Sequence, residues 1–167
     1  MKKIILTIFI LVLSFVFVAC SSSKSYEFDV KTVVDEIQKT ANVDTPQEIK
    51  DKVLLSDVMN LTADNIEEFH AIQASLGTKS DLIVFIKSTK GTASDVEKEL
   101  TAFRDNRADV FAPYDTNEQI KSENGIVVKK GDYVLLVIAG DNDKIANGEV
   151  ATIYSDIQTT IDTVLGE

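Results

Sequence analysis

Few residues in this chain could support nucleophilic catalysis. His70 is the only histidine, which excludes any metal site built on two histidines. A triad of serine, histidine and carboxylate would have to combine His70 with Ser75, Ser80 or Ser88. No glycines of the nucleophile-elbow type flank these serines. We therefore interpret His70 as a packed or edge-facing side chain and keep a hydrolase as the less favoured alternative.

One acidic segment has the composition of a calcium loop. Asp141-Asn142-Asp143 offers several oxygen ligands within three residues. Calcium loops alternate their ligands around a glycine, whereas Ile145 and Ala146 occupy the positions of a ligand and a turn residue. Acidic residues are also favoured at the start of a helix. We therefore expect a helix N-terminus here and no metal ligands.

Two pairs of like charge have simple interpretations. Glu67-Glu68 lies in a predicted strand, where neighbouring side chains point to opposite faces and cannot share one acid–base site. We expect one of these glutamates to be exposed and the other to lie at an edge or partly buried. Lys129-Lys130 falls in a predicted turn and is best interpreted as a solvated hairpin tip, with an anionic ligand as the alternative. The seven glycines are scattered, so no phosphate-binding loop occurs. We expect no cofactor and no catalytic residues.

Three aromatic residues lie near the second predicted hairpin. Tyr114 and Tyr133, with Phe111 close in sequence, could form the floor of a small groove for a peptide or a glycan. The alternative, which we favour, is that they close the edge of the core and leave their hydroxyls in water.

The N-terminus carries the most specific chemistry. A basic start, Met1-Lys2-Lys3, precedes about fifteen mostly apolar residues, which is the layout of a secretory signal. Phe17-Val18-Ala19-Cys20 follows and resembles the lipobox of bacterial lipoproteins, in which the cysteine is diacylated before cleavage. Cys20 is also the only cysteine, so the mature chain can form no internal disulfide. We expect a lipoprotein signal peptide over residues 1–19, a lipidated N-terminus and flexible tether over 20–28, and one domain over 29–167.

The charge of the mature chain excludes some partners. It retains 15 basic and 27 acidic residues, a formal charge of −12. Nucleic-acid binding depends on the neutralisation of phosphates by lysine and arginine, so we expect no nucleic-acid partner. Flat contact with anionic headgroups is disfavoured for the same reason. About 148 mature residues are enough for one domain with a real core.

The apolar pattern predicts an α+β fold. Helical spacing over residues 29–42, 94–111 and 142–165 predicts N-terminal, middle and C-terminal helices. Two hairpins, 66–74 with 81–87 and 126–128 with 133–138, alternate with these helices and predict a four-stranded, mostly antiparallel sheet. We further expect a short helical turn from Pro46 to Lys50 and a polar, helical link over 115–123. In the first strand, Ile66, His70, Ile72 and Ala74 are expected to share one face.

From about residue 60 onward the pattern resembles a known family. The residues that carry the resemblance are Ile66-Glu67-Glu68-Phe69, Leu82-Ile83-Val84-Phe85 before a charged helix, Tyr114, and Gly131-Asp132-Tyr133-Val134-Leu135-Leu136-Val137. The pattern is similar to that of small Firmicutes lipoproteins classed only as a domain of unknown function. The resemblance implies a surface lipoprotein of low-GC Gram-positive type. It brings no activity, cofactor or catalytic residue.

These features favour a role in the cell envelope without catalysis. We expect the protein to sit on the outer face of the cytoplasmic membrane, held by the lipid on Cys20, and to bind an envelope protein or glycan. A small-ligand-binding accessory of a transporter is the alternative, although the domain is much smaller than a two-lobed solute-binding protein.

Overall fold

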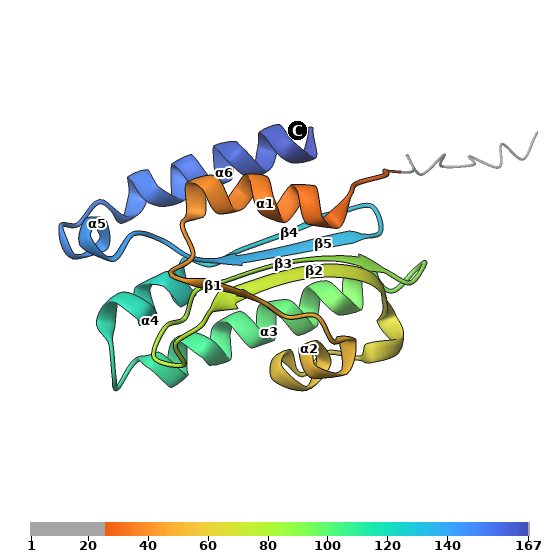
Figure 1. Ribbon diagram of the computed structural model, residues 1–167, viewed down its shortest axis with the longest axis horizontal. Helices are drawn as coiled ribbons and strands as arrows, with labels where there is room; N and C mark the ends of the chain where they lie inside the picture. The colour runs from red at the N-terminus through yellow and green to blue at the C-terminus, as the bar shows by residue number, and fades with distance from the viewer. Residues whose placement is uncertain (1–25, 167) are drawn as a thin grey trace, which may run out of the picture.

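The structure is a computed structural model that describes residues 26–166 (Figure 1). The predicted signal peptide and Cys20 lie outside the described residues. One antiparallel sheet contains β1 (Pro46–Glu48), β2 (Ile66–Ala74), β3 (Leu82–Ser88), β4 (Ile126–Lys130) and β5 (Tyr133–Ile138). The helices are α1 (Val30–Ala41), α2 (Lys52–Met59), α3 (Ala93–Phe111), α4 (Thr116–Glu123), α5 (Asn142–Ala146) and α6 (Val150–Leu165), with a 3₁₀ turn at Ala63–Asn65.

The two predicted hairpins join into one sheet of order β1-β2-β3-β5-β4. The join is the antiparallel pairing of β3 with β5, which runs from Leu82 opposite Ile138 to Lys87 opposite Tyr133. All six residues of β5 are buried, as expected for a central strand covered on both faces. The predicted α+β class is therefore confirmed, with five strands in place of four.

Helices cover both faces of the sheet (Figure 1). Alternate residues of each central strand face opposite sides, so the sheet supplies two cores. Phe85, Leu135 and Val137 pack with α1 and α6, whereas Val84, Leu136 and Ile138 pack with α2 and α3. The predicted N-terminal helix is confirmed as α1. Asp29 caps it, because its carboxylate accepts the Thr32 N–H at 2.7 Å.

The fifth strand replaces the helical turn that was predicted after Pro46. Residues 46–48 pair with residues 74–72 of β2 at the edge of the sheet, and all three are exposed. Proline is tolerated at a sheet edge because its missing N–H leaves no ladder hydrogen bond unmade on the solvent side. The apolar residues that follow, for which no element was predicted, form α2.

A β-bulge changes the face on which β2 begins. The register of β2 against β3 shifts between Ile66 and Glu68. An extra residue in one strand inverts the alternation beyond it. Ile66 therefore packs in the core beneath α3, whereas His70 and Ile72 face the opposite side, so the prediction of one shared face was wrong for Ile66. Glu67 and Glu68 are both exposed, which corrects the expectation that one would be partly buried.

The predicted C-terminal helix is two helices. Gly148 adopts a φ of +83°, which ends the α-helical path, so α5 stops at Ala146 and α6 starts at Val150. An L-residue with a side chain rarely adopts that conformation, and glycine makes the break inexpensive. The apolar stripe of α6 then packs beside α1.

An aromatic clamp fixes the start of the described chain against the domain. We define the clamp as Tyr26, Phe28, Phe85 and Tyr133. The Phe28 ring lies edge-on to Tyr133 at 5.1 Å, and the Phe28 N–H donates to the Tyr133 hydroxyl at 3.3 Å. Tyr26 stacks on Phe28 and packs over Gly131 in the β4–β5 turn. The chain therefore enters the domain at the end of the sheet that holds this turn.

Replacing Gly131 by alanine tests the clamp. Gly131 has a φ of +61°, and an added Cβ would lie 2.7 Å from Cδ2 of Tyr26. Gly148→Ala is the matched control, because its φ is also positive and no atom lies within 4 Å of the added Cβ. Both variants place alanine in the left-handed backbone conformation, which lowers the free energy of unfolding by about 1–2 kcal/mol. We expect Gly131→Ala to lose about 1 kcal/mol more in urea denaturation because the tyrosine must move. Equal losses would show that the Tyr26 contact contributes nothing.

Candidate functional site

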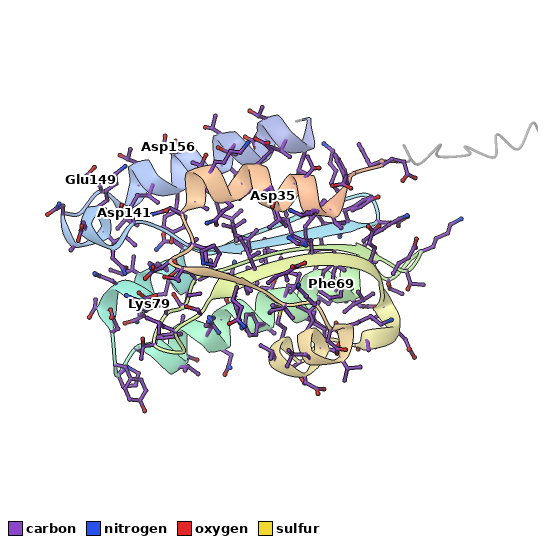
Figure 2. The ribbon with its side chains drawn as sticks, in the orientation of Figure 1. Asp35, Phe69, Lys79, Asp141, Glu149 and Asp156 are labelled. Carbon is purple, nitrogen blue, oxygen red and sulfur yellow. The ribbon has the colours of Figure 1, made fainter. Side chains whose placement is uncertain are left out.

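Five charged side chains converge at the end of the sheet opposite the aromatic clamp. We define this charged cluster as Lys79, Asp81, Arg107, Glu118 and Lys121. The first two belong to the β2–β3 turn, Arg107 to the C-terminal half of α3, and the last two to α4. Figure 2 shows Lys79 at the end of the domain that also holds Asp141.

Local sequence explains why α4 points two charges inward. Asp115 caps the helix, since its Oδ1 accepts the N–H groups of Asn117 and Glu118 at 2.9 and 3.3 Å. Residues three apart lie on one helix face, so Glu118 and Lys121 share the side that faces the sheet. Their side chains are 0% and 1% exposed.

Lys121 is fully satisfied within the cluster. Its Nζ lies 2.9 Å from both carboxylate oxygens of Asp81 and 3.2 Å from Oε1 of Glu118. An ammonium group has three protons to donate, and these three acceptors account for them. The Asp81 side chain is 0% exposed, so the interaction is shielded from water.

Glu118 connects α4 to the β2–β3 turn. Its Oε2 accepts from the N–H and the hydroxyl of Ser80 at 2.8 and 2.9 Å, and Oε1 accepts from Lys79 Nζ and Asn142 Nδ2 at 3.2 and 3.1 Å. Burial alone would raise the pKa of Glu118. The Ser80 N–H, the Lys121 ammonium and the other donors outweigh burial and lower this pKa to about 2. Glu118 is therefore ionised at neutral pH.

The remaining members of the cluster are also held in place. Burial raises the pKa of Asp81, against the opposing effect of Lys121. Arg107 donates to the carbonyls of Lys79 and Ser80 at 3.1 and 3.0 Å, and its guanidinium lies 5.5 and 5.4 Å from the ring centres of Phe103 and Phe111. Burial lowers the pKa of Arg107.

The arrangement is suited to holding segments together. Catalysis by a lysine or a carboxylate needs a lone pair or a proton that can reach a substrate. In the cluster, the Lys121 protons and the Glu118 oxygens are engaged by neighbouring protein groups. Buried ion pairs of this kind contribute little net stability but can specify one geometry. We therefore interpret the cluster as the support of the surface around it.

A polar cleft of about 250 Å³ lies on one side of the cluster. The loops 42–45 and 140–143 line it together with Lys121. Asp141 in this cleft caps α5, because its Oδ1 accepts the N–H groups of Asp143 and Lys144 at 2.9 and 3.0 Å. The predicted helix N-terminus is thus confirmed for Asp141-Asn142-Asp143. In residues 26–166 no group of acidic, histidine or cysteine side chains has the geometry of a metal site.

An apolar depression of about 450 Å³ lies on another side of the cluster. Gly77, Thr78, Val110, Phe111, Tyr114 and Asp115 line it. Tyr114 is 83% exposed and Val110 52% exposed, and Leu76 in the adjoining turn is 56% exposed. Phe111 lies under the Arg107 guanidinium, so the depression and the charged cluster share a wall.

The structure does not bring Tyr114 and Tyr133 together. Tyr133 is 2% exposed and belongs to the aromatic clamp, beside the C-terminal end of β3. Tyr114 lies near Gly77 and Thr78, beside the N-terminal end of β3. The two tyrosines therefore lie at opposite ends of the sheet and line no common groove.

His70 and two of the serines considered with it, Ser80 and Ser88, each contact other groups. His70 Nδ1 is 3.4 Å from Glu48 Oε1 of β1. The hydroxyl of Ser80 donates to Glu118 and that of Ser88 to the carbonyl of Asp132. The expectation of a packed histidine agrees with its 8% exposure. Lys129, predicted to be a solvated tip, contacts Ser94 and Glu97 of α3.

Sequence reasoning missed the residues at the centre of the site. The segment 115–123 was expected to be a polar, helical link, and its helix is confirmed as α4. Its composition gives no sign that Glu118 and Lys121 are buried, since the same residues are common on solvated helices. The one available signal was their spacing of three after a capping aspartate, which many exposed helices share.

Comparisons with known proteins identify a family to which the chain belongs, but that family has no known activity. The sequence model of a family described as a domain of unknown function, DUF4358, matches residues 39–139. No curated protein and no solved structure matches the chain. The matched segment includes all five members of the charged cluster and all of the residues that line the apolar depression.

The ionisation of Glu118 predicts a specific pH dependence. Its pKa of about 2 lies below the ordinary value of 4.5, so its stabilising effect is complete above pH 4.5 and is lost as the pH falls through 2. We expect Glu118→Gln to lower the free energy of unfolding at pH 7 by on the order of 3 kcal/mol, and the difference from the wild type to shrink between pH 4.5 and 2. Urea denaturation across this range measures it.

Glu123→Gln is the control for this experiment, since Glu123 is exposed on the same helix and contacts Gln119. We expect it to change stability little at any pH. Burial raises the pKa of Asp81 and the Glu118 charge adds to this effect, so the difference between variant and wild type measures Glu118 together with its coupling to Asp81. A difference that stays constant from pH 7 to 2 would contradict the assignment.

Proposed function

The chain belongs to the DUF4358 family, and from that premise we propose that it is a lipid-anchored protein of the cell envelope that binds another envelope component and catalyses no reaction. The observation that supports this proposal most is the pairing of a satisfied charged cluster with an exposed apolar depression. The groups that could react are engaged within the protein, whereas the apolar side chains beside them face solvent.

Exposed apolar surface is the usual mark of a binding surface. A soluble protein gains nothing by keeping large apolar groups in water, and contiguous patches of this kind often mark interaction sites. Tyrosine is among the residue types that contribute most to binding when a partner covers them. Tyr114, at 83% exposure, is therefore better explained by a partner than by the fold.

The anchor is proposed from the sequence of the N-terminus. Lipid on Cys20 would hold the domain at the outer face of the cytoplasmic membrane, as in lipoproteins of Gram-positive bacteria. Within residues 26–166, no helix combines the length and the apolar character needed to cross a bilayer. Five residues separate Cys20 from Tyr26, and the six steps from one Cα to the next span at most about 20 Å when the chain is fully extended. The anchor would thus keep the domain close to the membrane surface.

The polar cleft supports a second candidate function. Its size and its polar lining suit a small hydrophilic molecule, as in a ligand-binding accessory of a transporter. Stabilisation of the purified mature protein by one small molecule, lost when a bulky residue fills the cleft, would favour this candidate. Absence of stabilisation by any compound in a thermal-shift screen would count against it.

Cys20→Ala tests the anchor and its role in binding. In cells that express the full chain, we expect a clickable palmitate analogue to label the wild type and the control Ser22→Ala, but not Cys20→Ala. Cys20→Ala should also keep its signal peptide and run as a longer precursor on a gel, because cleavage follows acylation of the cysteine. A lysine-reactive crosslinker that does not cross membranes should capture the same partner from the wild type and from Ser22→Ala.

Two outcomes would contradict the proposal. Labelling of Cys20→Ala, or its cleavage to the length of the mature wild type, would contradict the lipid anchor. An abundant, correctly anchored wild type that captures no macromolecule would favour the small-ligand candidate.

A further inference from the structure

The apolar depression combines side chains from three segments that are distant in sequence. Gly77 and Thr78 come from the β2–β3 turn, Val110 from the end of α3, and Tyr114 from the link to α4. The exposed Leu76 precedes Gly77 in the same turn. Phe111, at 7% exposure, forms the floor. A single apolar side chain or a short turn of a partner would fit a depression of about 450 Å³.

The charged cluster holds these segments in one arrangement. Arg107 fixes the turn to α3 through the carbonyls of Lys79 and Ser80. Glu118 fixes the same turn to α4 through the Ser80 N–H and hydroxyl. A surface that is ordered before binding loses less entropy when a partner docks. The depression is therefore preorganised for binding.

The rim of the depression carries negative charge. Asp115 is among the residues that line it. The exposed Asp109 does not line the depression, but it is next to Val110 in α3 and adds a second carboxylate to the adjoining surface. The cationic group beside them, Lys79, is directed to Glu118 and its side chain is 23% exposed. A partner that covers the apolar groups must approach this acidic rim, so a basic residue next to the docking side chain is complementary.

The charge also argues against other occupants. A second copy of this chain would place one acidic rim against another, because a two-fold interface brings the same surface patch together twice. Anionic lipid headgroups would be repelled for the same reason. Moreover, the described chain begins ahead of α1 at the end of the domain opposite α4 (Figure 1), so the depression lies at the end away from the segment that leads to Cys20.

We propose that the apolar depression between the β2–β3 turn and the α3–α4 link binds a protein segment in which an apolar side chain lies next to lysine or arginine. The inference rests on the proposed function and deepens it, since it names the surface and the chemistry of the partner. The partner reaches the domain at the end away from the segment that leads to Cys20.

Site-specific photocrosslinking in cells tests this surface. The full chain would carry benzoylphenylalanine in place of Tyr114 or, as a matched control, in place of Val53. Val53 is also an exposed apolar residue, at 61%, but lies on α2. We expect one reproducible protein adduct from position 114 and none of the same mass from position 53. Mass spectrometry should place the adduct on a peptide with lysine or arginine near an apolar residue.

Two further substitutions separate docking from folding. Val110→Lys places in the depression, at an exposed position, a charge of the same sign as that of the proposed partner, so the domain should remain folded while the adduct from position 114 is lost. Asp109→Lys reverses one charge of the adjoining surface and should lower the adduct yield about fivefold, whereas Asp109→Glu should preserve it. An unchanged circular dichroism spectrum of each purified variant confirms that the fold is intact.

The outcomes distinguish this inference from the proposed function. Adducts from position 53 alone, a homodimer, or an adduct with lipid or glycan at position 114 would overturn the inference while leaving a binding role in place. Adducts at neither position, with Cys20-dependent capture of a partner by the lysine-reactive crosslinker, would also overturn it. Adducts at neither position without such capture would overturn both.

Discussion

The buried ammonium of Lys121, shared between the carboxylates of Asp81 and Glu118, is the interaction on which the candidate site depends. Removing the Lys121 ammonium would leave the two carboxylates without this shared counter-charge in a place shielded from water, and breaking a buried ion pair in this way costs about 3–5 kcal/mol. The protein therefore has one low-energy arrangement of α4 against the β2–β3 turn. Apolar packing alone would tolerate small shifts at this end of the sheet, because it has no direction.

This directional constraint links the fold to the proposed role. The antiparallel pairing of β3 with β5 builds a rigid sheet, and the aromatic clamp fixes one end of it to the chain that leads to Cys20. The charged cluster fixes the other end and with it the apolar depression. A domain with its attachment at one end and its exposed apolar surface at the other is suited to presenting that surface to a partner.

Most regular elements were predictable because their patterns are local. The helical stripe of α1 and the apolar run of β5 each reveal their structure within a dozen residues. The features that were missed depend on tertiary context. Pro46 enters a strand because β2 offers a free edge, and the bulge near Glu67 becomes visible only through its pairing with β3. Gly148 lies inside the segment that was predicted to be one C-terminal helix, and its positive φ could not be read from the sequence.

The charged cluster was unpredictable for a related reason. Lys79 and Asp81 precede Glu118 by almost forty residues, and the sequence of each segment is typical of a solvated surface. Their burial follows from the packing of α4 against the end of the sheet, which no single segment encodes. By contrast, the lipobox at Cys20 is a short local pattern, so the anchor was the clearest expectation from the sequence alone.

Hydrogen–deuterium exchange of Lys121→Met tests the central claim most directly. Lys39→Met is the matched control, because Lys39 also lies three residues from a glutamate on a helix but is exposed. We expect Lys121→Met to accelerate exchange most in residues 76–81 and in α4, more than in α1 or β5, while Lys39→Met leaves these segments unchanged. Acceleration that is uniform over the domain, or absent from the β2–β3 turn and α4, would contradict the claim that the cluster holds the binding surface in place.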